Sequence, residues 1–493
     1  MKKLLLLLLA LTLSLTLLTA CNNNDTPPID TDTEEEETEK ELTTADILGF
    51  DKKNYGEEFL ILLNDGAAIT KADFFAEEDA SDRVSIATYD RNLACEEYLG
   101  ISLQYVPKNG VWNSGITNEI YTLVSTGACD YDMAAIALNA GIMGGHISIF
   151  QNIMQMDYIE PTHSWWVQDM IDQVAINNQL YFLTGDTCVT TYAYIGCIFA
   201  NLDVAENFNL GVDFYETVKS GNWTMEEFYR LFKLVGEDTD NNGSFDPATE
   251  TYGWSNNNIS VRLMWSCCNM NLIERQEDGT FALIPSLDDR LITFISQLKT
   301  ELSDPHQSLV PASADMVKAF VADRVLFAAD LLSAAGSLKA ANIESDYAIL
   351  PMPKLDTNQA DYISTNMPAY NALFFPVTVE NPDMSAQVAE YMGWYGQENI
   401  IPEYYDQTLK LRQNDSEANI EMIDLIREKL RVTPNELYGI IGETGSDTVM
   451  FMLQTISSNL STDGFYSNPV SVWKTRYTTF ADRINSYVFK YYQ

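Results

Sequence analysis

Basic residues are scarce in this sequence. It holds 29 Lys and Arg against 71 Asp and Glu, which gives a formal net charge of −42 at pH 7. Nucleic-acid backbones are bound by clustered Lys and Arg side chains, so this balance argues against nucleic acid as a partner. Acidity of this size favours solubility and does not identify a ligand.

The sequence also lacks the short motifs of common active sites. It contains no G-x-S-x-G elbow, no H-E-x-x-H zinc helix, no Walker loop and no G-x-G-x-x-G fingerprint. A secreted glycosidase needs two carboxylates that flank one glycosidic bond, and the 71 acidic residues single out no pair. We therefore expect no catalytic residues and no enzyme activity, with a glycoside hydrolase as a disfavoured alternative.

Cysteine is scarce as well, with 7 residues and no C-x-x-C spacing that would indicate a zinc or redox site. Cys267 and Cys268 are adjacent, and adjacent cysteines rarely form an ordinary disulfide. The six cysteines other than Cys21 could pair in many ways, and buried free thiols agree with the sequence as well as bridges do.

Residues 1–21 have the pattern of an export signal. Two lysines precede the apolar run Leu4–Leu18, which is too short for a comfortable membrane span. The run ends in LTAC, which resembles a bacterial lipobox, so Cys21 is the expected site of lipidation. The mature protein would then be anchored by lipid at the outer face of the cytoplasmic membrane. An ordinary signal peptide or a short membrane anchor is the alternative.

Residues 22–46 predict a disordered acidic tether, because they hold ten acids, one base, two prolines and no aromatic residue. From Ile47 the composition is globular, and no second stretch has the length and apolarity of a transmembrane helix. A globular part of this length is too long for one core and predicts two lobes.

The first globular segments alternate between strand and helix patterns. Strands are predicted at Glu58–Leu63, from Ile101 to Tyr105 and at Tyr131–Leu138, with a helix at Ser81–Leu99. Such alternation predicts a mostly parallel sheet covered on both faces. Ligands of these sheets bind at the carboxyl ends of the strands.

Later segments continue the mixed pattern. Cys188–Ala200 is a long apolar, β-rich run, Thr224 fits the N-cap of a helix, and Asn381 fits another with proline next. Short strands are predicted at Asp346–Leu350 and at Ala372–Val379, where Pro376 indicates an edge or a bend.

Four stretches in a fixed order carry a resemblance to a known family. They are residues 90–106, residues 160–185 with a Trp-Trp loop, residues 223–253 with a W-T…Y-G block, and residues 346–362. Together they resemble the extracellular solute-binding proteins of ABC importers, the family that includes maltose-binding protein. Within that family, the resemblance is to the lipoproteins of clostridia and bacilli. The resemblance covers nearly all of residues 50–493.

The resemblance implies a type II periplasmic-binding-protein-like α/β fold. Two lobes, each a mostly parallel sheet with helices on both faces, would be joined by crossing hinge strands near residues 188–200 and 348–376. The expected division assigns residues 47–192 and 346–400 to lobe 1, and residues 193–345 and 401–493 to lobe 2.

The resemblance implies that the protein captures a small solute by cleft closure, and a carbohydrate is the expected solute. The solute would be delivered to an ABC permease in the membrane, and the protein would act as a monomer. A surface-anchored sensor subunit or an adhesin with the same fold is the alternative, and nothing in the sequence separates it from an importer subunit.

A calcium loop is the sharpest local motif. Oxygen-bearing residues alternate around a glycine as in an EF-hand loop, although the final acid comes one position late. An Asp- and Asn-rich surface turn without an ion is the alternative. The predicted ligands of a structural Ca²⁺ are Asp238, Asp240, Asn242, Ser244, Asp246 and Glu250.

Candidate ligand-binding residues come from two considerations. Sugars stack on aromatic faces, and polar side chains at strand ends can form hydrogen bonds with the sugar hydroxyls. For each residue the alternative is ordinary, namely core packing for a Trp and turn formation for an Asn or Asp. The candidates are Asn64, Asn139, Trp165, Trp166, Asp186, Trp254 and Trp394.

Overall fold

The computed structural model describes residues 42–109, 115–143, 147–238, 241–243, 246, 249–255, 259–284, 286, 288–302, 308–309, 313–409, 417–438, 477–479, 481–482 and 484–486. The chain divides into two units, residues 1–47 and residues 48–493. Cys21 and the rest of the predicted signal peptide lie outside the described residues. Across the described ranges, no helix combines the length and the apolar character that a membrane crossing requires.

Helix α2 (Thr44–Leu48) begins inside the predicted disordered tether, which therefore ends earlier than expected. The backbone N–H of Thr43 donates to the Asp46 carboxylate at 2.9 Å, and the backbone N–H of Asp46 donates to the Thr43 hydroxyl at 3.2 Å. This reciprocal pattern caps a helix start. The bonds from Thr43 also lower the pKa of Asp46.

The first sheet of residues 48–493 has the strand order β12-β3-β1-β2 within the described residues. β1 runs parallel to β2 and to β3, whereas β12 runs antiparallel to β3. The mostly parallel sheet that the alternating pattern predicts is therefore confirmed. Its strands are β1 (Glu57–Asn64), β2 (Ile101–Lys108), β3 (Met133–Ala137) and β12 (Asn371–Phe374).

Local sequence signals fix several helices that accompany this sheet. The predicted helix before β2 is α4, which begins after Asp82, whose carboxylate accepts the backbone N–H of Ser85 at 2.9 Å. It ends at Gly100, which adopts φ 62°. Asn381 caps α16 as predicted. The helices are α3 (Ala68–Ala72), α4 (Arg83–Leu99), α5 (Gly115–Thr126), α6 (Leu138–Met143), η1 (Ile147–Ile149), η2 (Ile153–Gln155), α7 (Gln168–Val174), α16 (Pro382–Tyr395), the π-helical turn η3 (Gly396–Ile400) and α17 (Ile401–Leu409).

The second sheet has the order β11-β4-β10-β6-β5, with β9 paired to β6. β10 runs parallel to β6, and β6 runs parallel to β9, whereas β4 runs antiparallel to both β10 and β11, and β5 runs antiparallel to β6. Within the described residues this sheet is therefore mixed, whereas a mostly parallel sheet was expected in each lobe. A separate hairpin joins β7 (Ile273–Arg275) and β8 (Phe281–Leu283). The strands of the second sheet are β4 (Gly196–Asn201), β5 (Gly236–Glu237), β6 (Thr251–Ser255), β9 (Ser308–Leu309), β10 (Val325–Leu331) and β11 (Tyr347–Pro351).

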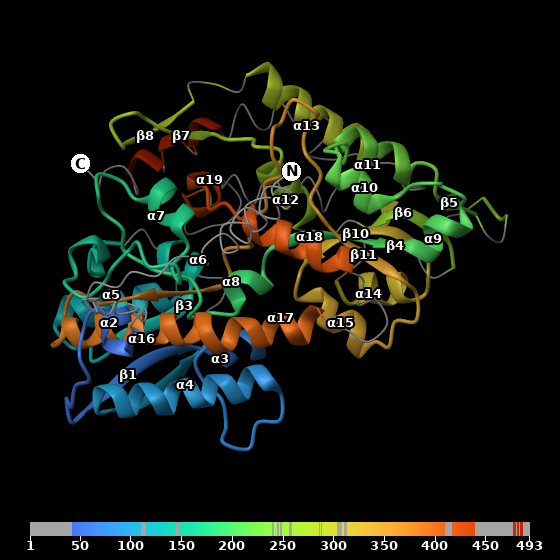
Figure 1. Ribbon diagram of the computed structural model, residues 1–493. Coiled ribbons are helices and arrows are strands. Elements are labelled where there is room, and N and C mark those ends of the chain that lie inside the picture. The colour runs from blue at the N-terminus through green and yellow to red at the C-terminus, as the bar shows by residue number, and fades with distance from the viewer. Residues whose placement is uncertain are drawn as a thin grey trace, which may run out of the picture. The chain divides into compact units, whose positions relative to one another are not determined.

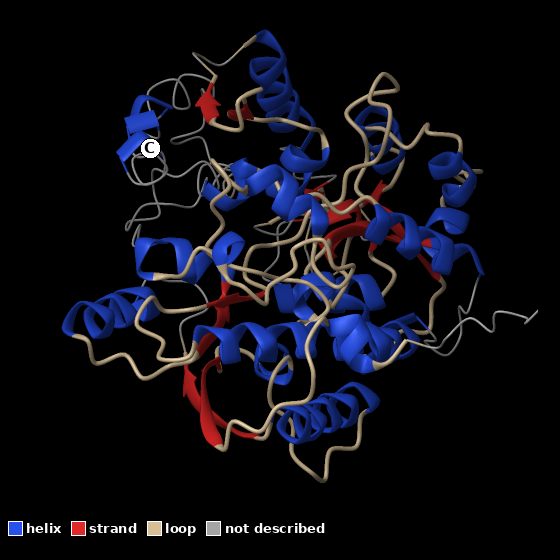
Figure 2. Cartoon of the chain, turned by 60° about the vertical axis from the view of Figure 1, so that its left-hand side comes forward, coloured by secondary structure: helices blue, strands red, loops and turns tan. Residues whose placement is uncertain are grey.

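Helices flank the second sheet on both sides, with α10 and α11 on one side and α14 and α15 on the other (Figure 1). The two sheets occupy separate parts of the residue 48–493 unit (Figure 2). As predicted, Thr224 caps α11, where its hydroxyl accepts the backbone N–H of Glu227 at 3.3 Å. The remaining helices are α8 (Thr190–Ala193), α9 (Leu202–Asn207), α10 (Phe214–Lys219), α11 (Met225–Phe232), α12 (Ser260–Cys267), α13 (Asp289–Leu302), α14 (Ser313–Val321), α15 (Ala334–Ala340), α18 (Glu417–Glu428) and α19 (Pro434–Tyr438).

Two segments cross between the sheets. The outgoing segment, residues 184–195, contains α8 and leads into β4, and the returning segment, residues 352–370, runs from β11 to β12. They pair with each other through an antiparallel bridge between Ile195 and Asn366. The predicted crossings near residues 188–200 and 348–376 agree with this arrangement.

Three details differ from the sequence predictions. β11 pairs with β4 in the second sheet, so it lies on the other side of the lobe boundary expected at residue 346. The apolar run Cys188–Ala200 begins with the short helix α8 before it becomes a strand. β12 ends at Phe374, two residues before Pro376, which lies in an isolated antiparallel bridge with Phe150.

Aromatic packing fills the core of the second sheet. Trp254 in β6 and Phe228 on α11 meet edge-on with ring centroids 5.2 Å apart, and Trp223 donates its indole N–H to the Pro351 carbonyl at 2.8 Å. The six cysteines of the described chain are buried and free, so none of them forms a disulfide. The core is therefore held by packing.

Candidate functional site

Asn64 ends β1 and lies in a buried polar network of the first sheet. Its side-chain N–H donates to Asn371 Oδ1 at 2.9 Å, and Asn371 donates to Asp73 Oδ2 at 2.9 Å. Asp73 also accepts the backbone N–H of Thr190 at 3.1 Å and the Thr190 hydroxyl. Burial raises the pKa of Asp73 to about 7, and the bonds from Thr190 and Asn371 oppose this rise. Asn64 thus has protein partners, and its role in ligand binding stays a prediction.

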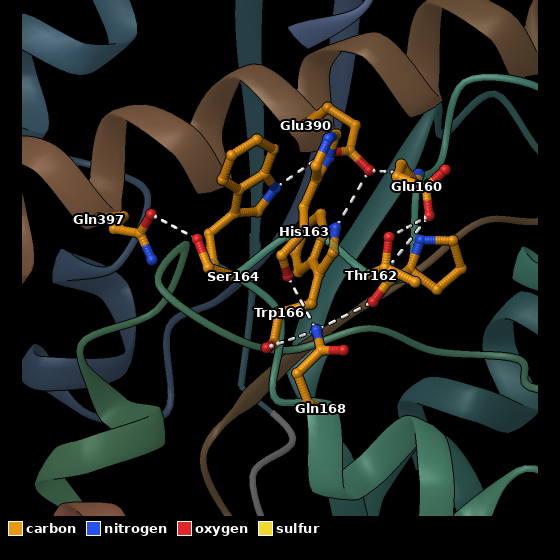
Figure 3. A network of polar contacts seen from close by, with 10 residues as sticks. Glu160, Thr162, His163, Ser164, Trp166, Gln168, Glu390 and Gln397 are labelled. Carbon is orange, nitrogen blue, oxygen red and sulfur yellow. Dashed lines mark hydrogen bonds and ion pairs between the residues drawn. The ribbon is translucent and has the colours of Figure 1, made fainter. Parts of the chain in front are cut away.

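Trp165 and Trp166 both donate their indole N–H groups to the buried carboxylate of Glu390 on α16. Figure 3 shows this carboxylate with Trp166 and His163. The two N–H···O distances are 2.8 Å and 3.0 Å. His163 Nδ1 lies 2.9 Å from the same carboxylate, and the backbone N–H of Glu160 donates to it at 2.8 Å. Each carboxylate oxygen therefore receives two donors, as a buried charge requires.

The Trp-Trp loop packs closely onto α16 around this carboxylate. A β-carbon at Gly393 would lie 2.4 Å from Trp165 Cδ1, so only glycine allows the indole to approach the helix. The rings of His163 and Trp165 also lie against each other, with centroids 4.0 Å apart. The structure shows that both tryptophans anchor this loop, and their use as sugar platforms stays a prediction.

Asp186 lies at the start of the outgoing crossing segment and is buried. Its carboxylate accepts the Tyr192 hydroxyl and the side-chain amide of Gln397, the latter at 3.0 Å. Burial raises the pKa of Asp186 to about 6, and the bond from Tyr192 and the charge of Arg427 oppose this rise. The Arg427 guanidinium lies between two aromatic rings, 5.1 Å from Tyr192 and 4.9 Å from Tyr405. These contacts stabilise the crossing segment.

Two further tryptophan candidates lie in different surroundings. Trp254 is fully buried in the core of the second sheet. Trp394 is half-buried on α16, where it meets Tyr391 edge-on at 5.5 Å. The structure does not bring these two residues together with Asn139.

Asn139 lies on α6, directly after β3, beside the returning crossing segment. Its backbone N–H donates to the Pro368 carbonyl at 2.8 Å, and its side-chain oxygen accepts the backbone N–H of Ala140 at 2.8 Å. Helix α6 also contacts α19. Asn139 is therefore the sequence candidate that adjoins the polar cluster described next.

Five buried polar side chains meet where α12, α19 and the returning crossing segment come together, and we call them the central polar cluster. Arg262 and Ser266 lie one turn apart on α12 and so share a face of the helix. Glu436 lies on α19, where its backbone N–H donates to the Thr433 hydroxyl at 3.3 Å. Glu436 lies within hydrogen-bonding reach of the Ser266 and Thr365 hydroxyls and within electrostatic reach of Arg262 and Tyr370. The cluster consists of Arg262, Ser266, Thr365, Tyr370 and Glu436.

The members of this cluster carry polar atoms without hydrogen-bond partners among the described residues. Buried polar groups are almost always hydrogen-bonded, so a group of exceptions at one place indicates a site for water or ligand. Arg262 is 8% exposed and Glu436 3%. The unpartnered atoms are Arg262 Nη2, Ser266 Oγ, Thr365 Oγ1, the Tyr370 hydroxyl and Glu436 Oε1.

The charges in the cluster are buried and only loosely compensated. Burial lowers the pKa of Arg262 to about 10 and raises the pKa of Glu436. The nearby hydroxyls of Ser266 and Thr365 and the charge of Arg262 oppose the rise at Glu436. These groups are thus neighbours, but within the described residues none of the ion pairs joins Arg262 to Glu436.

A pocket of about 380 Å³ reaches the cluster at Ser266. This volume is within the usual range for small-molecule sites. The Asp169 carboxylate accepts the backbone N–H of Val432 at 2.8 Å and lies 3.6 Å from Arg431 Nε, which ties α7 to the segment before α19. Other polar lining residues include Gln173, Asn269, Asn271 and Arg275.

A larger pocket, of about 810 Å³, lies between α11 and α13 on the flank of the second sheet. Tyr229 and Phe294 contribute aromatic surface, but several of its charged residues have protein partners. Lys233 pairs with Glu301, and Arg230 pairs with Glu227 at 2.7 Å. This pocket therefore shows less unmet hydrogen-bonding capacity than the central polar cluster.

The predicted calcium loop is described only in part, because Asp240 and Ser244 lie outside the described residues. The Asp238 carboxylate accepts the backbone N–H of Asn242 at 3.2 Å and of Gly243 at 2.7 Å. The backbone N–H of Glu250 donates to the Asp246 carbonyl at 3.0 Å, and the Glu250 side chain is fully buried. Among the described residues, no three acidic, His or Cys side chains gather closely enough to hold a metal ion.

The central polar cluster was not predicted from the sequence. A signal does exist for Arg262, since it is the single charged residue in the mainly apolar stretch SVRLMWSC. Glu436 follows Thr433 by three residues, and that spacing by itself indicates only a helix cap. Their proximity depends on the tertiary fold.

No protein-family model matches the chain, and no curated protein sequence matches it. Solved structures do match. A cyclo/maltodextrin-binding protein complexed with maltotetraose has a TM-score of 0.56 at 11% identity, covering 87% of this chain and 97% of that one. The galacto-N-biose/lacto-N-biose I-binding protein of an ABC transporter of Bifidobacterium longum, in complex with lacto-N-biose, gives the same four values.

The solute-binding protein RafE in complex with raffinose has a TM-score of 0.52 at 13% identity, covering 86% of this chain and 99% of that one. At these identities the likeness shows the fold. The chain has the two-domain α/β fold of these solute-binding proteins.

Replacement of Glu390 tests whether the Trp-Trp loop is anchored as described. In Glu390→Gln one carboxylate oxygen becomes an amide donor that faces at least one indole N–H, which can only donate. We expect the free energy of unfolding to fall by about 2–4 kcal/mol in urea denaturation. The control Glu398→Gln changes an exposed residue of the following turn and should shift it by less than about 0.5 kcal/mol. Equal effects of the two variants would contradict the anchoring role.

Proposed function

We propose that this chain is a carbohydrate-binding solute-binding protein that delivers its ligand to an ABC permease. The observation that carries the proposal is the central polar cluster, where five buried polar atoms lack partners among the described residues. A polyhydroxylated ligand supplies both hydrogen-bond donors and acceptors, which is what these atoms need.

The position of the cluster supports binding by domain closure. Thr365 and Tyr370 belong to the returning crossing segment, whereas Arg262 and Ser266 belong to α12 beside the second sheet. A ligand that bonds both elements would favour one relative arrangement of the two sheets, as in hinge-type closure. A permease could then distinguish the loaded form from the empty form.

The structural neighbours agree with a sugar ligand. The proteins compared above are in complex with maltotetraose, lacto-N-biose and raffinose. They are binding proteins, which supports a function by binding alone, without covalent chemistry. Because their identity to this chain is low, the sugar ligand and the transporter partner are proposals for this chain.

Binding of a saccharide to the full chain is the direct test. We expect a thermal midpoint shift with at least one member of a panel of mono- and oligosaccharides, with amino acids and peptides as controls. A ligand at about 100 times its dissociation constant adds about 2.7 kcal/mol to the free energy of unfolding. A response to peptides alone would contradict the carbohydrate ligand, and no response to any solute would contradict the importer function.

We also propose a structural Ca²⁺ held by the loop of Asp238, Asp240, Asn242, Ser244, Asp246 and Glu250. Two described features support it. The chain already turns around the Asp238 carboxylate, and Glu250 is a buried carboxylate at the end of the loop. A hard cation surrounded by oxygen ligands would neutralise these acids and fix the loop.

Calorimetric titration of the metal-free protein with CaCl₂ tests this site. We expect one binding event and a higher thermal midpoint in the presence of calcium. Asp238→Asn should weaken binding at least about tenfold, because a charged ligand is lost. Asp278→Asn, in the exposed turn capped by Asp278 and Thr280, is the matched control and should bind calcium normally. Absence of heat at millimolar calcium would exclude the site.

The lipid anchor at Cys21 is a further part of the proposal and is supported by the sequence of residues 1–21. When the full chain is produced in a bacterium, we expect it in the membrane fraction, with the mass of Cys21 increased by acyl chains. Cys21→Ser should abolish the added mass. An unmodified Cys21 in the processed protein would contradict lipidation.

A further inference from the structure

We infer that Arg262 and Glu436 form a two-pole clamp that selects an uncharged polyol, with neighbouring ligand hydroxyls bridging the guanidinium and the carboxylate. The inference rests on the proposed function and assigns the residues that determine its specificity. It concerns the chemical class of ligand that the central polar cluster accepts.

The two side chains approach the cluster from different elements. Arg262 lies on α12 and Glu436 on α19, and both are more than nine-tenths buried. Arg262 Nη1 donates to Met367 Sδ at 3.2 Å, and a thioether is a weak acceptor. Within the described residues, Arg262 Nη2 and Glu436 Oε1 have no hydrogen-bond partner. Each charge therefore keeps at least one unused bonding position.

Opposite charges that are buried near each other without direct contact favour a neutral bridging group. An adjacent pair of sugar hydroxyls fits, because one oxygen accepts a guanidinium N–H while the other hydroxyl donates to the carboxylate. Both bonds are charge-assisted and stronger than bonds between neutral groups. A ligand anion would be attracted by Arg262 but repelled by Glu436, and a ligand cation would meet the reverse, so the pair as a whole favours a ligand without net charge.

The neutral members of the cluster distinguish a polyol from a zwitterion. An amino acid could also satisfy both poles, with its carboxylate at Arg262 and its ammonium group at Glu436. It would add no hydroxyl for Ser266, Thr365 and Tyr370, whose hydroxyl oxygens make no hydrogen bond of ordinary geometry among the described residues. A ligand with several hydroxyls can engage these side chains as well as the two charges. The observations therefore favour the polyol.

The pocket of about 380 Å³ provides the neighbouring space for such a ligand. Ser266 belongs to both the pocket and the cluster, so a sugar ring at the clamp could extend into it. The polar lining of Gln173, Asn269 and Asn271 offers amide groups for further hydroxyls. An oligosaccharide is thus compatible with this site.

The first experiment uses isothermal calorimetry on the wild-type full chain and needs no variant. We compare the affinity of the tightest-binding neutral saccharide of the panel with the affinities of its single deoxy analogues and of its uronate. We expect two deoxy positions on adjacent carbons to lose at least about 100-fold in affinity, because each leaves a buried charge unpaired. The uronate that places its carboxylate beside this pair should bind at least about tenfold more weakly than the neutral sugar.

The second experiment compares Arg262→Met and Glu436→Gln with wild type. Each variant should lower affinity for the neutral sugar at least about tenfold, and Glu436→Gln should also reduce the discrimination against the uronate. A purely structural residue would not change that ratio. Arg230→Met and Glu301→Gln, at the pocket between α11 and α13, are the matched controls and should retain wild-type affinity. Circular dichroism confirms that each variant is folded.

The outcomes separate this inference from the proposed function. If no saccharide binds wild type, the carbohydrate function itself fails. If a saccharide binds, but its deoxy analogues and its uronate bind with the same affinity as the parent sugar, the function stands and the clamp is overturned. If an amino acid binds instead and loses affinity in both variants, the two poles are confirmed as a binding pair but the polyol assignment is overturned.

Discussion

Two backbone hydrogen bonds hold the crossing segments together, from Gly196 N–H to the Thr365 carbonyl and from Met367 N–H to the Tyr194 carbonyl, each at 2.9 Å. They fix the register of the outgoing segment against the returning one. Because Thr365 lies in this pairing, its side chain is held at the junction of the two sheets. The central polar cluster depends on that register, since a shift by one residue would turn Thr365 to the opposite face.

The buried charges of this protein fall into two kinds. Asp73, Asp186 and Glu390 receive hydrogen bonds from several protein donors, so the fold itself compensates them. Arg262 and Glu436 are also buried, although slightly less deeply, and keep unpartnered atoms among the described residues. A buried unsatisfied charge lowers stability, so its presence requires an explanation, and the bound ligand proposed above provides one. The number of hydrogen-bond partners that the buried charges have, more than burial or pocket size, distinguishes the candidate site from the structural networks.

Much of the fold could be predicted from local sequence patterns. The alternation of strands and helices, the cap at Asn381 and the stop at Gly100 are properties of neighbouring residues, and the structure confirms them. The resemblance to solute-binding proteins adds the two-lobe arrangement. Helix α8 was missed because the residues Thr190–Ala193 favour a strand by composition, and only the surrounding crossing segment makes them helical.

The site was less predictable because its members are distant in sequence. Asn64 was selected as a strand end, but its main partner, Asn371, lies 307 residues away. Trp165 and Trp166 were selected as aromatic surfaces, yet their indole N–H groups meet a carboxylate 225 and 224 residues away. No periodicity or spacing in one sequence encodes such pairs. The same holds for Arg262 and Glu436.

The free cysteines have a consequence for how motion in this molecule can be followed. Cys188 lies on the outgoing crossing segment, Cys197 in β4, and Cys267 on α12 within the electrostatic reach of Glu436. All are buried, and burial raises the pKa of the Cys267 thiol well above its ordinary value. A thiol reagent can reach such a group only when the surrounding structure opens. The rates at which thiol reagents label these native cysteines therefore report how often the surrounding structure opens, and no introduced probe is needed.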